Sequence, residues 1–143
     1  MKKLLLCLMT LLVSGSLSSA PTIDGSSLFD VFYDINAHGS YSYAQKVMKN
    51  HGFRLIRKED YGDGANHFVL HYAVPGCETV EIGWQGAVGF GIRVSTSSAT
   101  LGRQLQQRAL RRGFRNLDGD ETIKSDGKCF LWLSDSGFWM YGR

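Results

Sequence analysis

Apolar and polar residues alternate along some parts of the chain and follow helical spacing along others. Period-two alternation, typical of strands with one buried face, runs through "FVLHYA" from residue 68 and "TVEIGW" from residue 79, whereas the hairpin that begins with "FLWLS" at residue 130 is apolar on both faces. Helical spacing puts the apolar residues of two other stretches on one face: Ala44, Val47 and Met48, and later Leu101, Leu105 and Ala109. The pattern therefore predicts an α+β fold, with helices packed on one face of an antiparallel sheet.

The two helical stretches end in the same way. "HGFR" at 51–54 returns as "RGFR" at 112–115, which places Gly52 and Gly113 61 residues apart. A glycine after a helix commonly adopts the left-handed conformation, which it enters without a steric penalty. We expect both glycines to stop a helix, and Phe53 and Phe114 to fold back against its last apolar residues.

The same offset, carried backward, aligns Phe29, Val31 and Tyr33 with Phe90, Ile92 and Val94. Both triplets alternate at period two, so the repeat predicts a strand at each place. The first segment also fits a helix, through Leu28, Val31, Phe32 and Ile35, but the matching register favours a strand.

The chain thus divides into two similar units, residues 21–86 and 87–143, which together form one compact domain. Each unit is predicted to contain a strand, a helix, a glycine stop and an antiparallel meander. Ser40 is the candidate N-cap of the first helix, and Ser97 or Ser98 that of the second.

Hairpin register follows from the pairing that keeps apolar residues on one face. In the first meander, a three-residue loop at 75–77 sets Leu70 opposite Ile82 and His71 opposite Glu81, whereas a two-residue loop mixes the faces. In the last hairpin, a two-residue turn at 135–136 gathers Phe130, Trp132, Trp139 and Tyr141 on one face and Leu131, Leu133, Phe138 and Met140 on the other.

The aromatic face of this last hairpin is the predicted binding site. If the aliphatic face meets the helices, then Phe130, Trp132, Trp139 and Tyr141 lie on the outer surface and offer the ring types that dominate binding hot spots. The alternative is that the first unit covers these rings as core.

The first twenty residues change how charge is interpreted. "MKKLLLCLMTLLVSGSLSSA" joins two lysines to a short apolar run and small residues, the layout of an export signal at 1–20. Its removal, after Ser18 or Ala20, leaves 14 basic against 13 acidic residues. A net charge of +1 does not favour nucleic acid as a partner, and no segment is long enough to predict a membrane span. We expect a periplasmic or extracellular protein.

Two cysteines, Cys77 and Cys129, remain beyond the signal. In an oxidising compartment a pair of cysteines most simply forms a disulfide, and closing a 52-residue loop stabilises the fold by about 4 kcal/mol. A metal site or a nucleophilic cysteine is the alternative, because the chain contains four histidines.

Catalytic and cofactor signals are weak. His71 opposite Glu81 is the best candidate for proton transfer, since a carboxylate beside an imidazole holds its tautomer. His67 and His71 are about 13 Å apart along a strand, too far to share a metal ion. "GAVGFG" leads into a strand, the reverse of a dinucleotide loop, so no cofactor is predicted.

Two units of a helix followed by an antiparallel meander, with "GF" after each helix and an aromatic-rich sheet, resemble the tandem modules of the β-lactamase inhibitory protein and related small periplasmic domains. The resemblance implies a sheet surface presented to another protein. The sequence therefore predicts an exported, non-enzymatic module that binds a protein or cell-envelope component. The alternative is a small hydrolase or transferase using His71 and Glu81.

Overall fold

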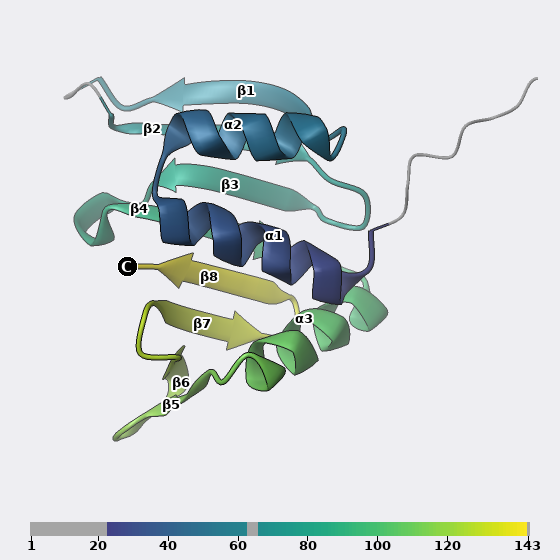
Figure 1. Cartoon of the computed structure of the whole chain (residues 1–143), viewed down its shortest axis with the longest axis vertical. Coiled ribbons are helices and arrows are strands. Elements are labelled where there is room, and N and C mark those ends of the chain that lie inside the picture. The colour runs from purple at the N-terminus through teal and green to yellow at the C-terminus, as the bar shows by residue number, and fades with distance from the viewer. Residues whose placement is uncertain (1–22, 63–65, 143) are drawn as a thin grey trace, which may run out of the picture.

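The computed structural model describes residues 23–62 and 66–142, so the predicted export signal at 1–20 lies outside the described residues (Figure 1). The elements follow in the order α1 (Gly25–His38), α2 (Tyr41–Asn50), β1 (Arg54–Asp60), β2 (Phe68–Ala73), β3 (Thr79–Trp84), the short 3-10 helix η1 (Gly86–Val88), β4 (Phe90–Ser95), α3 (Ala99–Arg111), β5 (Arg115–Leu117), β6 (Asp120–Ser125), β7 (Phe130–Ser134) and β8 (Gly137–Tyr141). In this part of the chain, no helix is long and apolar enough to cross a membrane.

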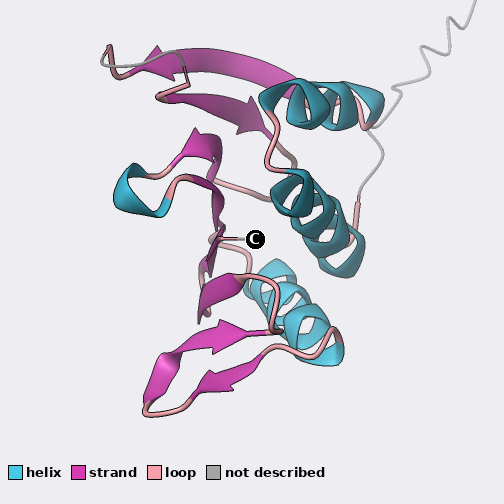
Figure 2. Cartoon of the chain, turned by 60° about the vertical axis from the view of Figure 1, so that its left-hand side comes forward, coloured by secondary structure: helices cyan, strands magenta, loops and turns pink. Residues whose placement is uncertain are grey.

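One antiparallel sheet contains all eight strands, in the order β1-β2-β3-β4-β8-β7-β6-β5. The three α-helices lie on the same side of it, as the edge-on view in Figure 2 shows. The predicted α+β class, with helices on one face of an antiparallel sheet, is confirmed. Both predicted units contribute strands to this single sheet, and none of the described α-helices lies on the opposite face, here called the outer face.

The repeated helix ends have the predicted geometry. Gly52 and Gly113 have φ values of 74° and 95°. At each end the following phenylalanine donates its backbone N–H to a carbonyl five residues back, Phe53 to Met48 and Phe114 to Ala109, as in a Schellman motif. Both rings enter the core. Ser40 and Ser98 cap α2 and α3 as expected.

The predicted strand at Phe29, Val31 and Tyr33 is wrong, because these residues belong to α1. Leu28, Phe29, Phe32 and Ile35 are all fully buried, which is the spacing of one helix face. Asp24 caps this helix by accepting the N–H of Ser27 at 2.9 Å. A triplet at i, i+2 and i+4 does not separate strand from helix, and the offset of 61 aligned α1 with a true strand, β4.

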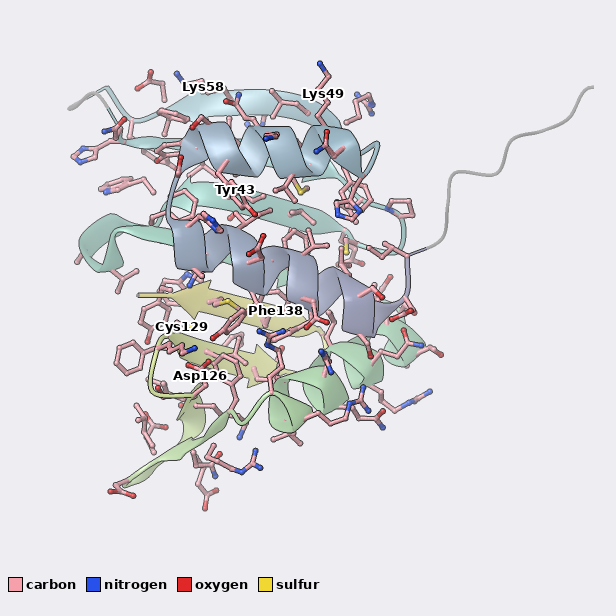
Figure 3. The ribbon with its side chains drawn as sticks, viewed as in Figure 1. Tyr43, Lys49, Lys58, Asp126, Cys129 and Phe138 are labelled. Atoms are coloured by element: carbon pink, nitrogen blue, oxygen red, sulfur yellow. The ribbon has the colours of Figure 1, made fainter. Side chains whose placement is uncertain are left out.

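The aliphatic face of the last hairpin forms the centre of the core. Leu131, Phe138 and Met140 are at most 1% exposed. The ring of Phe138 lies edge-on to Phe29 and Phe32 of α1, with ring centroids 5.4 and 6.0 Å apart. In Figure 3, Phe138 projects from β8 toward α1. The hairpin is therefore fixed by its inner face, and its outer face is left for other contacts.

Helices α1 and α3 are joined by a charged cluster. The Asp30 carboxylate accepts hydrogen bonds from Arg108 at 2.9 Å and from Arg112 at 2.8 Å. Burial opposes ionisation of Asp30, but the two guanidinium groups outweigh it and lower its pKa below the ordinary value. Two of the arginines that make α3 basic thus hold the helical layer together.

The predicted Cys77–Cys129 disulfide is not formed in this structure, where both thiols are free. Cys77 precedes β3 and Cys129 precedes β7, with β4 and β8 between these strands, so three strand spacings, roughly 14 Å, separate them. The strand registers also place Thr79 level with Ser134, the last residue of β7. Cys77 lies near Thr79, whereas Cys129 precedes the first residue of β7, so the two cysteines are at opposite ends of their strands. A disulfide needs Cα atoms within about 7 Å, so this arrangement does not favour the bond, and the disulfide stays a prediction.

Candidate functional site

Side chains on the outer face stand in rows because the strand registers are continuous across the sheet. One row runs from β1 to β6 through Arg57, His71, Glu81, Arg93, Trp139, Trp132 and Ile123. The predicted pairings in both hairpins, including Leu70 with Ile82 and Trp132 with Trp139, are confirmed. The row is charged over β1 to β4 and aromatic over β8 and β7.

The aromatic part is a patch of four rings, Phe130, Trp132, Trp139 and Tyr141, which we call the aromatic patch. Phe130 and Trp132 are 41% and 44% exposed, and the other two are half-buried. Tyr141 lies 5.6 Å from Phe130 and 4.9 Å from Trp139 between ring centroids. The structure thus places the predicted binding residues together on the outer face, away from the helix-side core.

A hollow of about 370 Å³ lies beside the patch. Trp132 and Trp139 line it, together with Ser95, Ser134 and Gly137 from the next row of the sheet. Gly137 stands where β8 comes close to the backbone of β4. A Cβ there would come within 2.0 Å of the Val94 carbonyl oxygen, so the close approach of β8 to β4 requires glycine.

Trp139 has an unsatisfied polar group. Its indole Nε1 is shielded from solvent and has no hydrogen-bond acceptor among the described residues. A buried indole N–H normally has an acceptor, because leaving it unpaired costs free energy. The guanidinium of Arg93 lies 5.3 Å from the centre of the Trp139 ring, within cation–π range.

The charged half of the row is a strip of ion pairs. Four of its members, Arg57, His71, Glu81 and Arg93, belong to this row, and the fifth, Glu59, lies two residues along β1 from Arg57. We call these five residues the charged strip. Glu59 lies 3.2 Å from Arg57 and 2.9 Å from His71 Nε2, while His71 Nδ1 lies 3.9 Å from Glu81. Glu81 also approaches Arg93 at 4.0 Å. Arg93 therefore links the charged strip to the aromatic patch.

His71 and Glu81, the predicted proton-transfer pair, are neighbours as expected. However, the His71 side chain is only 13% exposed, and its two ring nitrogens face Glu59 and Glu81. Nε2 is within hydrogen-bond distance of Glu59, whereas Nδ1 is beyond hydrogen-bond distance of Glu81. The arrangement fixes the imidazole between β1 and β3 and contains no nucleophile.

The two thiols are poorly suited to nucleophilic chemistry. Burial raises the pKa of Cys77 to about 11. Burial, followed by the nearby Asp126 carboxylate, raises the pKa of Cys129 to about 12. Figure 3 shows Cys129 and Asp126 close together near β7. Because the thiolate is the reactive form, both cysteines are expected to be inert at neutral pH.

Sequence reasoning found the aromatic patch but missed Arg93 and Ser95 beside it, and Glu59 in the charged strip. Arg93 and Ser95 join the patch through the pairing of β4 with β8, which no local turn specifies. Glu59 meets His71 only because β1 contains an irregularity in register between Leu55 and Arg57. The outward positions in "FGIRVS" were a usable signal, since they alternate with the buried residues Ile92 and Val94.

Within residues 23–62 and 66–142, no group of three or more histidine, cysteine, aspartate or glutamate side chains is arranged to hold a metal ion. Comparison with known proteins identifies no matching family model, no similar curated protein and no similar solved structure. The proposals below therefore depend on the geometry of this chain alone.

Proposed function

We propose that the protein is an exported, non-enzymatic binding module that recognises a protein or cell-envelope component through the aromatic patch. The observation that carries this proposal is the pair of exposed rings, Phe130 and Trp132, on a sheet face that no α-helix of the described residues covers. Soluble proteins seldom leave contiguous large aromatics exposed unless they bind something. The export signal predicted at 1–20 supports a periplasmic or extracellular location.

Binding is better supported than the alternative, a hydrolase or transferase using His71 and Glu81. That mechanism requires a free ring nitrogen next to a nucleophile. In the structure His71 Nε2 lies 2.9 Å from the Glu59 carboxylate, and burial raises the pKa values of both thiols, which favours their protonated form. By contrast, the aromatic patch adjoins a hollow and contains an unpaired donor.

The test compares retention of purified protein on isolated cell envelopes of the source organism. We expect Trp132→Ala to reduce retention at least tenfold, because truncating a hot-spot residue typically costs about 2 kcal/mol or more of binding. Leu110→Ala is the matched control. The exposed fraction of Leu110, 46%, is similar to the 44% of Trp132, but Leu110 belongs to α3 on the other side of the sheet.

Each variant is first shown to keep a wild-type far-UV circular dichroism spectrum. Equal retention of Trp132→Ala, Leu110→Ala and the wild type refutes the proposed surface. A Glu81→Gln variant addresses the enzymatic alternative. If an esterase or glycosidase activity were found and Glu81→Gln abolished it, the charged strip would be the functional site.

A further inference from the structure

We propose that the hollow beside the aromatic patch binds a pyranose ring of a glycan, with Trp132 and Trp139 against the apolar face of the sugar and serine hydroxyls at its edge. This inference rests on the proposed function and narrows its partner to one chemical class. It is carried by three features of the hollow: its size, its rim and its unpaired donor.

The size of the hollow suits a small ring. A volume of about 370 Å³ is at the lower end of the range of roughly 300–1,000 Å³ found for small-molecule sites. The two tryptophans that line it present faces with negative electrostatic potential. The axial C–H groups of a pyranose are weakly positive and form a flat apolar surface, so they complement such a face.

The rim of the hollow is polar in a way that suits a polyhydroxylated ligand. Ser95, Ser134 and Ser136 line it. Ser95 Oγ lies 2.7 Å from Thr79 Oγ1, and Ser134 Oγ lies 3.2 Å from Ser136 Oγ. A hydroxyl has one donor and two acceptor positions, so each keeps capacity for a ligand hydroxyl. Serine is depleted from the hot spots of protein interfaces, which favours a glycan over a protein partner.

The Trp139 indole N–H supplies the third feature, a donor without an acceptor. A sugar hydroxyl oxygen entering the hollow is the acceptor that this group lacks. The half-exposed Arg93 side chain lies 5.3 Å from the centre of the Trp139 ring and 4.0 Å from Glu81, and both of these contacts are weak enough for a ligand to displace. Binding then converts an unpaired buried donor into a hydrogen bond.

The experiment titrates purified protein with cellohexaose and with chitohexaose and follows tryptophan fluorescence and calorimetric heat. We expect saturable binding of at least one of the two oligosaccharides. Trp139→Phe keeps an aromatic ring and removes the N–H, so it should weaken that binding about 3- to 10-fold. Ser134→Ala should weaken it by a similar factor.

Trp84→Phe is the matched control for Trp139→Phe. Trp84 ends β3, where it pairs with Phe90 and stacks on His67, and it does not line the hollow. Its replacement should therefore leave saccharide affinity unchanged. Equal effects of the two tryptophan variants would overturn the inference.

Failure of the glycan inference is distinguishable from failure of the proposed function. If neither oligosaccharide binds while Trp132→Ala still reduces retention on envelopes, the aromatic patch is a binding surface but its ligand is not a sugar, and the inference is overturned. If neither saccharide binding nor Trp132-dependent retention is found, both proposals are wrong. Saccharide binding that is insensitive to Trp139→Phe and to Ser134→Ala locates the site elsewhere and also overturns the inference.

Discussion

The two faces of the hairpin formed by β7 and β8 have similar apolar content but opposite roles. On β8, Phe138 and Met140 face the helices and are almost completely buried, whereas Trp139 between them faces outward. Trp132 of β7 pairs with Trp139 on the same outer face. Both sets are strongly apolar, although the outer set is aromatic and the inner set mainly aliphatic. The difference comes from the helical layer, which covers only one side of the sheet. A strand that is apolar on both faces thus has one face for folding and another available for binding.

The largest expected effect is on the inner face. Phe138→Ala removes a ring that packs edge-on to two rings of α1, and we expect it to lower the free energy of unfolding by about 3–5 kcal/mol. Urea unfolding followed by circular dichroism measures this. A loss below about 1 kcal/mol would mean that the aliphatic face is not the core.

A smaller loss of stability is expected at the end of α3, where Gly113 precedes the buried ring of Phe114. Gly113 has a φ of 95°, and Gly113→Ala should cost about 1–2 kcal/mol, because a Cβ is strained in the left-handed region. No neighbouring atom lies within 4 Å of the added Cβ, so the cost is conformational and not a clash. Arg112→Ala, at the preceding position, is unsuitable as a control because it also breaks the contact with Asp30.

Ser97→Ala is the better comparison for Gly113→Ala, since Ser97 precedes the α3 N-cap and makes no part of the helix stop. We expect it to change stability by less than about 0.5 kcal/mol, as surface substitutions usually do. Equal stability of Gly113→Ala and the wild type would contradict the assignment of this glycine as a helix stop.

The outer face should tolerate truncation. Trp132→Ala is expected to cost about 1 kcal/mol or less, because 44% of the side chain is exposed and no helix covers it. The same urea titration measures the free energy of unfolding, and the loss for Trp132→Ala is compared with the loss for Phe138→Ala. A loss for Trp132→Ala as large as that for Phe138→Ala would place this ring in the core and remove the proposed surface.

The last prediction concerns the thiols, which lie on the inner side of the sheet. Cys129 belongs to the buried core, and Cys77 is partly buried and packs against other residues of that core. Their folded pKa values, about 12 and about 11, exceed the ordinary value of 9.0. Below pH 9 the folded and unfolded states both keep these protons, so stability is unaffected. As the pH rises further, the unfolded chain loses them first, and stability falls.

Unfolding at several pH values above about 9 tests this sign, with Cys77→Ala and Cys129→Ala expected to make the alkaline decline shallower. Native protein should also react slowly with iodoacetamide at neutral pH and show two reactive thiols after unfolding. Rapid labelling of the folded protein would contradict the proposed burial. A linked Cys77–Cys129 peptide in non-reducing mapping would restore the disulfide and require a different arrangement of β3 and β7.

Local patterns in the sequence predicted the elements that local physics determines. Both hairpin registers were correct because a one-residue slip would turn apolar residues such as Leu70 and Leu131 to the outer face. Both helix stops were correct because a positive φ strongly favours glycine, as at Gly52. The position of the aromatic patch followed from the same alternation.

The errors came from contacts between distant parts of the chain. The α1 segment was assigned to a strand because an apparent repeat outweighed its helical spacing, with Leu28 and Ile35 on one face. The disulfide between Cys77 and Cys129 is a separate case: it was inferred from the number of cysteines and stays a prediction, although the strands that lie between the two cysteines in this structure do not favour it. Arg93 was missed because β4 meets β8 through a long-range pairing that no turn encodes.

The position of β8 between β4 and β7 has a consequence for the order of folding. The first four strands can pair as successive hairpins, and so can β5, β6 and β7, but the two groups become one sheet only when β8 fits between them. Its contacts with β4 join residues more than forty positions apart, which is slow because a long loop must close before any contact forms. During synthesis this strand emerges after the other seven. Until it docks, the β4 edge stays unpaired, and this intermediate is where misassembly and aggregation are most expected.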